Sequence, residues 1–123
     1  MHVHNVVCLE DDLDLAHFIE LAVSAWPATV HLAHDGVHGL ELIRAQKPDL
    51  ILLDLGLPGL NGWEICTVVK NDPDLRTIPI IVLTAVPIEN QERGVLSQVF
   101  DYLVKPFSLY HLRHALESVL VPA

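Results

Sequence analysis

Apolar residues along this chain follow two spacings, and the two spacings alternate. Short uninterrupted apolar runs have the length and continuity of strands that are buried on both faces. Between these runs, apolar residues recur at the three- and four-residue spacing of amphipathic helices. The predicted strands cover residues 6–9, 29–32, 49–54, 79–84 and 100–104, and the predicted helices cover 13–26, 36–47, 62–71, 89–98 and 109–120.

Residues at the helix boundaries support this assignment. Asp12, Asp35 and Asn61 each stand immediately before a predicted helix, where a short polar side chain accepts hydrogen bonds from the free backbone N–H groups of the first turn. Pro27 follows the first helix and Pro48 follows the second. Proline ends a helix because its ring clashes with the preceding turn and it has no N–H to donate.

The alternation of strands and helices predicts an α/β fold with a parallel sheet and right-handed crossovers. We expect one doubly wound, flavodoxin-like domain over residues 1–123, with five strands in the order 2-1-3-4-5 and five flanking helices. Such sheets bind ligands beyond the carboxyl ends of the strands, where the strand order reverses. That point lies between the first and third strands, which end at residues 10–11 and at Asp54.

Composition narrows the range of functions. The chain has 123 residues and is 51% apolar, which suits one domain with a buried core and excludes a disordered chain. Its apolar runs are too short to cross a bilayer, and its start lacks a secretory signal, so we expect a cytoplasmic domain without a membrane partner. The formal charge of −9, with seven scattered Lys and Arg residues, argues against direct binding of nucleic acid.

Cysteine and histidine give weaker signals. Cys8 and Cys66 lie within apolar patterns and match no metal or redox spacing, so we expect two core residues. His31, His34 and His38 are close in sequence, but they fall on a strand, a loop and a helix start. We therefore favour scattered surface imidazoles over a zinc or copper site.

Polar side chains gather at the predicted carboxyl ends of the strands. The acidic run 10–12 follows the first strand, Asp54 and Thr84 end the third and fourth, and Lys105 follows the fifth. Carboxylates this close together disfavour one another's ionisation unless a cation compensates them. An all-oxygen site of this kind suits Mg²⁺. A carboxylate nucleophile, a metal, an ammonium and a hydroxyl are together the parts that phosphoryl transfer needs.

At these motifs the chain resembles the bacterial response-regulator receivers of two-component signalling, of which the chemotaxis regulators are examples. The resemblance covers essentially the whole chain, in the same order. It rests on Glu10-Asp11-Asp12 after an apolar strand, Leu-Leu-Asp-Leu-Gly-Leu-Pro-Gly around Asp54, Val-Leu-Thr-Ala ending at Ala85, and Asp-Tyr-Leu-Val-Lys-Pro-Phe ending at Phe107.

The resemblance implies a role for each site residue. Asp54 would accept the phosphoryl group, while Glu10, Asp11, Asp54 and the backbone carbonyl of Gly56 would hold Mg²⁺. The pair Asp11-Asp12 is an alternative for the metal, but Asp12 stands where the following helix needs its cap, so we prefer Glu10-Asp11.

Three further residues would carry the response to the phosphoryl group. Lys105 would pair with it and precede a cis bond to Pro106, Thr84 would move toward it, and Tyr102 would swing inward as the switch. The moving face would be the fourth helix, the fifth strand and the last helix.

The partners that the resemblance implies are a sensor histidine kinase or a histidine phosphotransfer protein, and an effector protein downstream. A phosphorylation-dependent dimer is a further expectation. The domain would not be an enzyme beyond catalysing its own phosphorylation and dephosphorylation. We expect no output domain within these residues, and the sequence leaves open whether the receiver stands alone or belongs to a longer regulator or hybrid kinase.

One segment departs from the usual receiver pattern. Ser97-Gln98-Val99-Phe100 stands where receivers commonly carry a small residue and glycine. Without glycine, a left-handed cap would be strained there, so we expect a shorter or displaced fourth helix.

Three other functions are compatible with an α/β fold of this kind. A haloacid-dehalogenase-type phosphatase needs an acidic residue two positions after its nucleophile, where this chain has Gly56. A flavin carrier needs a hydroxyl-rich loop after the first strand in place of the acidic run. A receiver-like interaction module that is never phosphorylated would not need the intact set of site residues, and it is the principal alternative.

Overall fold

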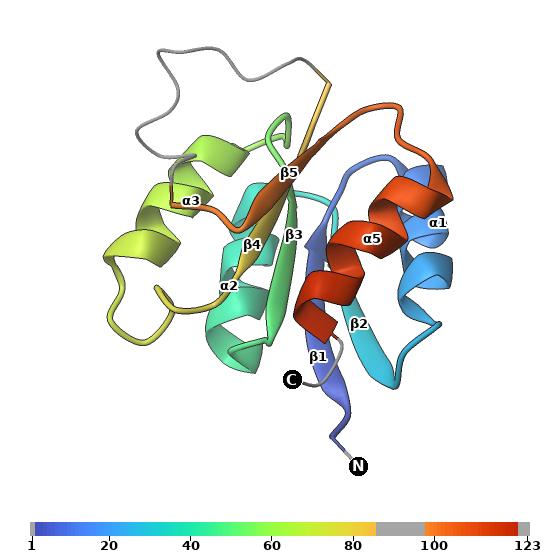
Figure 1. Ribbon diagram of the computed structural model, residues 1–123. Helices are drawn as coiled ribbons and strands as arrows, with labels where there is room; N and C mark the ends of the chain where they lie inside the picture. The colour runs from blue at the N-terminus through green and yellow to red at the C-terminus, as the bar shows by residue number, and fades with distance from the viewer. Residues whose placement is uncertain (1, 86–97, 121–123) are drawn as a thin grey trace.

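A computed structural model describes residues 2–85 and 98–120, which form one sheet with helices on both of its faces (Figure 1). The strands are β1 (His4–Leu9), β2 (Ala28–Ala33), β3 (Leu50–Asp54), β4 (Ile80–Thr84) and β5 (Asp101–Val104). The helices are α1 (Leu13–Val23), α2 (Gly36–Gln46), α3 (Gly62–Asn71) and α5 (Leu109–Leu120).

The sheet has the predicted topology. All its strand pairs are parallel and their order is β2-β1-β3-β4-β5. Four of the five expected helices lie in the described part of the chain. The remaining one, expected at 89–98, falls outside the described residues except for Gln98, which lies in a turn.

Most boundaries agree with the prediction within one or two residues, and the largest difference is at the end of the first helix. The first helix was expected to reach Trp26, but it ends at Val23 with Ser24 as its C-cap. Ala25 and Trp26 donate their backbone N–H groups to carbonyls three residues earlier, at Ala22 and Val23. These tighter bonds close the helix before Pro27, so the apolar spacing continues beyond the helix itself.

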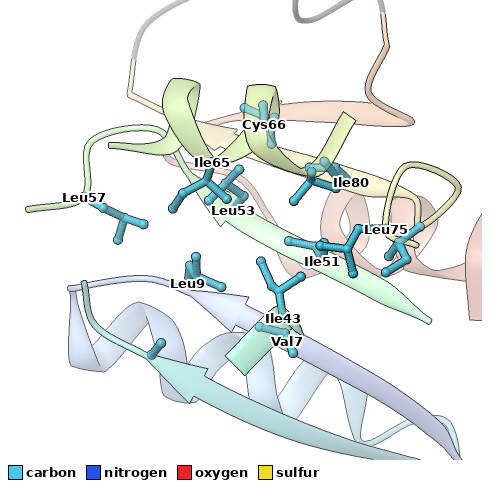
Figure 2. Packing of buried hydrophobic residues seen from close by; sticks show 14 of the residues in the cluster. Val7, Leu9, Ile43, Ile51, Leu53, Leu57, Ile65, Cys66, Leu75 and Ile80 are labelled. Carbon is cyan, nitrogen blue, oxygen red and sulfur yellow. The ribbon is translucent and has the colours of Figure 1, made fainter. Parts of the chain in front are cut away.

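Side chains of the central strands alternate between two apolar layers. In β1, Val6 and Cys8 face the layer formed with α1 and α5, whereas Val7 and Leu9 face the layer formed with α2 and α3. Figure 2 shows the second layer, with Leu53 of β3 packed beside Ile65 of α3. Every residue of β3 and β4 is buried, as expected for strands covered on both faces.

The predicted caps are present. The side chain of Asp12 accepts hydrogen bonds at the start of α1, and that of Asp35 does so at the start of α2. Asn61 and Glu64 form a reciprocal capping box at the start of α3. These caps accept hydrogen bonds from backbone N–H groups that would otherwise lack partners in the first turn of each helix.

Both cysteines are buried and free, as predicted. Burial raises the pKa of the Cys66 thiol to about 12 and that of Cys8 further still, so neither is a reactive thiolate near neutral pH. None of the helices in the described ranges combines the length and hydropathy that a bilayer crossing requires.

Candidate functional site

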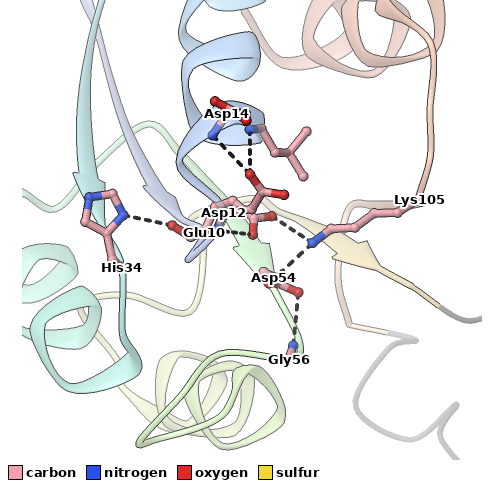
Figure 3. A network of polar contacts seen from close by, with 8 residues as sticks. Glu10, Asp12, Asp14, His34, Asp54, Gly56 and Lys105 are labelled. Atoms are coloured by element: carbon pink, nitrogen blue, oxygen red, sulfur yellow. Dashed lines mark hydrogen bonds and ion pairs between the residues drawn. The ribbon is translucent and has the colours of Figure 1, made fainter.

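The polar site lies at the carboxyl ends of β1 and β3, the two neighbouring strands between which the strand order reverses. Leu9 at the end of β1 pairs with Leu53, so Glu10 follows on one strand and Asp54 on the other at the same edge of the sheet. Figure 3 shows Glu10, Asp54 and Lys105 converging there from three separate segments.

A close approach of α3 shapes the loop that follows Asp54. A side chain carbon added at Gly62 would lie 2.6 Å from the backbone oxygen of Asp54 and 2.6 Å from Cα of Leu55. Glycine at this position therefore lets the first turn of α3 pack directly against the end of β3. Gly62 also donates its backbone N–H to the carbonyl of Leu55.

Lys105 brings one positive charge to two buried carboxylates. Its Nζ lies 2.9 Å from Glu10 Oε1 and 3.4 Å from Asp54 Oδ2. Glu10 is fully buried, Asp54 is buried, and the side chain of Lys105 is 23% exposed. The backbone N–H of Lys105 donates a 2.7 Å hydrogen bond to the carbonyl of Thr84. This bond fixes the backbone from which the Lys105 side chain extends next to the end of β4.

Burial and charge act against each other in this pocket. Burial raises the pKa of Glu10 to about 7, although the Lys105 ammonium and the backbone N–H of Asp12 both favour its charged form. Burial alone would lower the pKa of Lys105, but the Glu10 and Asp54 carboxylates outweigh it and raise that pKa above its usual value. One ammonium therefore faces two buried acidic side chains, Glu10 and Asp54.

The carboxylate oxygens keep capacity to bind a further cation. Glu10 Oε2 accepts a 3.1 Å hydrogen bond from the backbone N–H of Asp12, and Asp54 Oδ1 accepts one of 3.0 Å from that of Gly56. Apart from its ion pair with Lys105, the buried Glu10 Oε1 has no hydrogen-bond partner in the described part of the chain.

Glu10, Asp11 and Asp54 fit a hard divalent cation. One carboxylate oxygen from each lies within 4.8 Å of the others. Neighbouring oxygen ligands on an octahedral Mg²⁺, each about 2.0–2.1 Å from the metal, are about 2.9 Å apart, so these side chains would have to draw closer together around the ion. The donor set consists of oxygen alone and carries excess negative charge, as Mg²⁺ prefers.

The other predicted site residues lie on β4, on β5 and just after β5. Thr84 is buried at the end of β4, one position beyond Leu83, which pairs with Asp54. The Lys105–Pro106 bond is cis, as expected. Tyr102 lies on the edge strand β5 and is 47% exposed.

One hydrogen bond at the site, made by His34, was not predicted from the sequence motifs. The ring Nδ1 of His34 donates a 3.0 Å hydrogen bond to the backbone carbonyl of Glu10 (Figure 3). It fixes the backbone that presents Glu10 and Asp11. The two residues are 24 positions apart, and no local pattern connects them. His31 and His38 bond elsewhere, to Asn5 and Asp35.

Comparisons with known proteins agree on one family. The model of the response regulator receiver domain matches residues 6–117. The response regulator ArlR of Staphylococcus epidermidis is 37% identical over 118 residues, covering 94% of this chain and 52% of that protein. The chain spans about half the length of the curated relatives it matches.

Solved structures match over nearly the whole chain. The phosphorylated cyanobacterial phytochrome response regulator RcpA superposes with a TM-score of 0.87 at 28% identity, covering 99% of this chain and 97% of that one. The receiver domain of a Pseudomonas aeruginosa sensor histidine kinase, with a magnesium ion in its active site cleft, has a TM-score of 0.84 at 27% identity, covering 98% and 100%. With its sheet order and family match, this chain belongs to the receiver domains of two-component response regulators.

Proposed function

We propose that Asp54 is the phosphoacceptor of this receiver and that it takes the phosphoryl group from a phosphohistidine donor. The observation that carries the proposal is the position of its carboxylate, which is buried between two further acids and a lysine ammonium. An isolated surface aspartate has no comparable means of compensating the charge that a phosphoryl group adds.

In the transfer, a carboxylate oxygen of Asp54 forms a bond to phosphorus while the bond from phosphorus to the donor imidazole nitrogen breaks. The donor histidine keeps the electron pair of that bond and regains a proton. Lys105, already 3.4 Å from Asp54 Oδ2, is placed to bind an incoming phosphoryl oxygen. A Mg²⁺ held by Glu10, Asp11 and Asp54 would neutralise charge on the phosphoryl oxygens. The backbone carbonyl of Gly56 is proposed as a further ligand.

The charge of the phosphoryl group can also drive a change of conformation. The phosphoryl group adds close to two negative charges and three acceptor oxygens. Lys105 and Thr84 can each donate a charge-assisted hydrogen bond to it, worth about 1.5–3 kcal/mol. Such energies are enough to shift a population between two conformations. Tyr102, which is exposed on β5, would report the shift to effector proteins bound at the face that includes β5 and α5.

We further propose that residues 1–123 form the receiver unit, which contacts a sensor kinase or phosphotransfer protein and an effector protein. The domain would then catalyse only the gain and hydrolysis of its own phosphoryl group. A cytoplasmic location and a phosphorylation-dependent dimer belong to the same proposal.

Mass spectrometry of the intact protein tests the assignment. The protein is incubated with Mg²⁺ and a small acyl phosphate, and we expect the mass of one added phosphoryl group. Asp54→Asn removes the nucleophile with almost no change in shape, so we expect no addition. Asp49→Asn is the matched control, because Asp49 lies at the opposite end of the sheet and outside this pocket, and it is expected to be modified like the wild type.

Three results separate the alternatives. Addition that persists in Asp54→Asn would place the phosphoryl group on another residue. A wild type that gains no mass would favour the interaction module that is never phosphorylated. Addition that survives removal of divalent cations by a chelator would contradict the role given to Mg²⁺.

A further inference from the structure

A second group of potential metal ligands lies at the amino end of the sheet. It consists of His2 just before β1, His4 at the first position of β1, and Asp49 just before β3. β1 runs from His4 toward Glu10, so this group and the acidic pocket are about 20 Å apart, at about 3.3 Å per strand residue. The two groups share no residue.

The ligand atoms of this group are already close to the separations of a bound ion. His2 Nε2 lies 3.3 Å from Asp49 Oδ2, and His4 Nδ1 lies 4.0 Å from the same oxygen. The rings of His2 and His4 meet edge to face with their centroids 4.7 Å apart. Ligands on a tetrahedral zinc, each about 2.0–2.1 Å from the metal, are about 3.3 Å from one another. Small side-chain rotations are therefore enough to close the site.

Two of the three ligands are held in place by the fold. Asp49 Oδ2 accepts a 2.7 Å hydrogen bond from the backbone N–H of Asn5, and the N–H of Asp49 returns a 2.8 Å bond to the carbonyl of Asn5. The side chain of His4 is 15% exposed. His2, with 66% of its side chain exposed, is the ligand that can adjust. This division, with two fixed ligands and one adjustable ligand open to solvent, also gives an ion a path of entry.

We propose that His2, His4 and Asp49 form a site for a borderline transition-metal ion, specifically Zn²⁺, with water completing the coordination. Two imidazole nitrogens and one carboxylate oxygen are donors that zinc binds in proteins, whereas Mg²⁺ prefers oxygen alone. The acidic pocket and this site therefore select different cations. The proposal is independent of phosphorylation and stands whether or not Asp54 is modified.

The site is tested by competition between the protein and a coloured zinc chelator. Untagged protein comprising residues 1–123 is used, because an added histidine tag would itself bind zinc, and excess Mg²⁺ occupies the acidic pocket. We expect one equivalent of Zn²⁺ to bind. His4→Gln and Asp49→Asn should each lower the affinity by at least about tenfold, since the loss of even an outer partner of a metal ligand costs 10–100-fold.

His38→Gln is the matched control. His38 also has an aspartate partner, with Nδ1 2.6 Å from Asp35 Oδ2. Among the residues described, no third His, Cys, Asp or Glu side chain lies close enough to complete a metal site with this pair. Its variant should bind zinc as the wild type does. The imidazole nitrogen resonances of His2 and His4 should shift on addition of zinc, which ties the ion to these rings.

The outcomes are decisive in both directions. A tenfold loss in His4→Gln and Asp49→Asn, with unchanged affinity in His38→Gln, supports the site. A wild type that does not compete for zinc overturns the proposal. Equal affinities in wild type, His4→Gln and Asp49→Asn also overturn it, because the ion would then be bound elsewhere.

Discussion

The two ends of this sheet carry similar residue types in opposite environments. At the carboxyl end, Glu10 and Asp54 are buried against Lys105. At the amino end, Asp49 meets His2 and His4 with 40% of its side chain exposed. A carboxylate beside a nitrogen-bearing side chain is present in both places, but water reaches one of them and is largely excluded from the other.

This difference decides how much each charge matters. In a buried pocket, an ion pair is strongly coupled to folding and to ligand binding, because neither partner is solvated when the other is removed. At the surface, water replaces a lost partner and the pair contributes little. Equivalent substitutions at the two ends of the sheet should therefore have unequal effects on the free energy of unfolding.

The largest expected effect is the pH dependence of stability that arises from Glu10. Its pKa is raised from 4.5 to about 7 in the folded protein, so between these values the folded state holds a proton that the unfolded state has lost. The free energy of unfolding should therefore fall as pH rises through this window. At about 1.4 kcal/mol per pH unit, the fall amounts to about 3 kcal/mol.

Denaturant unfolding with a chelator present, repeated across this pH range, measures the slope. Glu10→Gln cannot titrate and should flatten it. Equal slopes in the wild type and in Glu10→Gln would show that Glu10 holds no extra proton in the folded state and would contradict its raised pKa.

A smaller loss is expected for Lys105→Met. The substitution leaves Glu10 and Asp54 facing each other without the ammonium. Removing one partner of a fully buried pair costs about 3–5 kcal/mol, but Lys105 is partly exposed and Glu10 can take up a proton, so we expect about 2 kcal/mol at pH 7.

Lys70→Met is the control for Lys105→Met, measured by the same denaturant method. Lys70 Nζ donates a single hydrogen bond to the carbonyl of Arg76, and its loss should cost no more than about 1 kcal/mol. Equal losses of unfolding free energy in the two variants would mean that Lys105 contributes no more to stability in the acidic pocket than Lys70 does outside it.

The smallest effect belongs to Asp49→Asn in the absence of metal. The asparagine oxygen can still accept the hydrogen bond from the backbone of Asn5, and the exposed contact with His2 is worth little. We expect a change in unfolding free energy below about 1 kcal/mol. A loss as large as that of Lys105→Met would erase the distinction between the two ends.

Much of the fold followed from patterns that are local in the sequence. Continuous apolar runs predicted β3 and β4, and Asp12, Asp35 and Asn61 predicted three helix starts. The end of α1 was missed because the apolar spacing continues through Ala25 and Trp26 while the hydrogen bonds change type. Spacing reports which face is buried, and it does not report where the backbone turns.

The proximity of Glu10 and Asp54 was predictable from the sequence, but the energetics of their pocket were not. The topology alone brings Glu10 and Asp54 to one edge of the sheet. The complete burial of Glu10, and the single ammonium shared by two acids, depend on packing that no motif records. The contact of His34 and the grouping of His2 with Asp49 join distant positions for the same reason.

We propose that Glu10, Asp11 and Asp54 bind a divalent cation beside the phosphoacceptor. A crystal structure with Mg²⁺ and beryllofluoride, a mimic of the phosphoryl group, tests it most directly. We predict Mg²⁺ about 2.0–2.1 Å from oxygens of these three residues, with beryllofluoride on Asp54 and within hydrogen-bonding distance of Lys105 Nζ. An ion bound elsewhere, or an Asp54 without beryllofluoride in a crystal where another residue carries it, would contradict the claim.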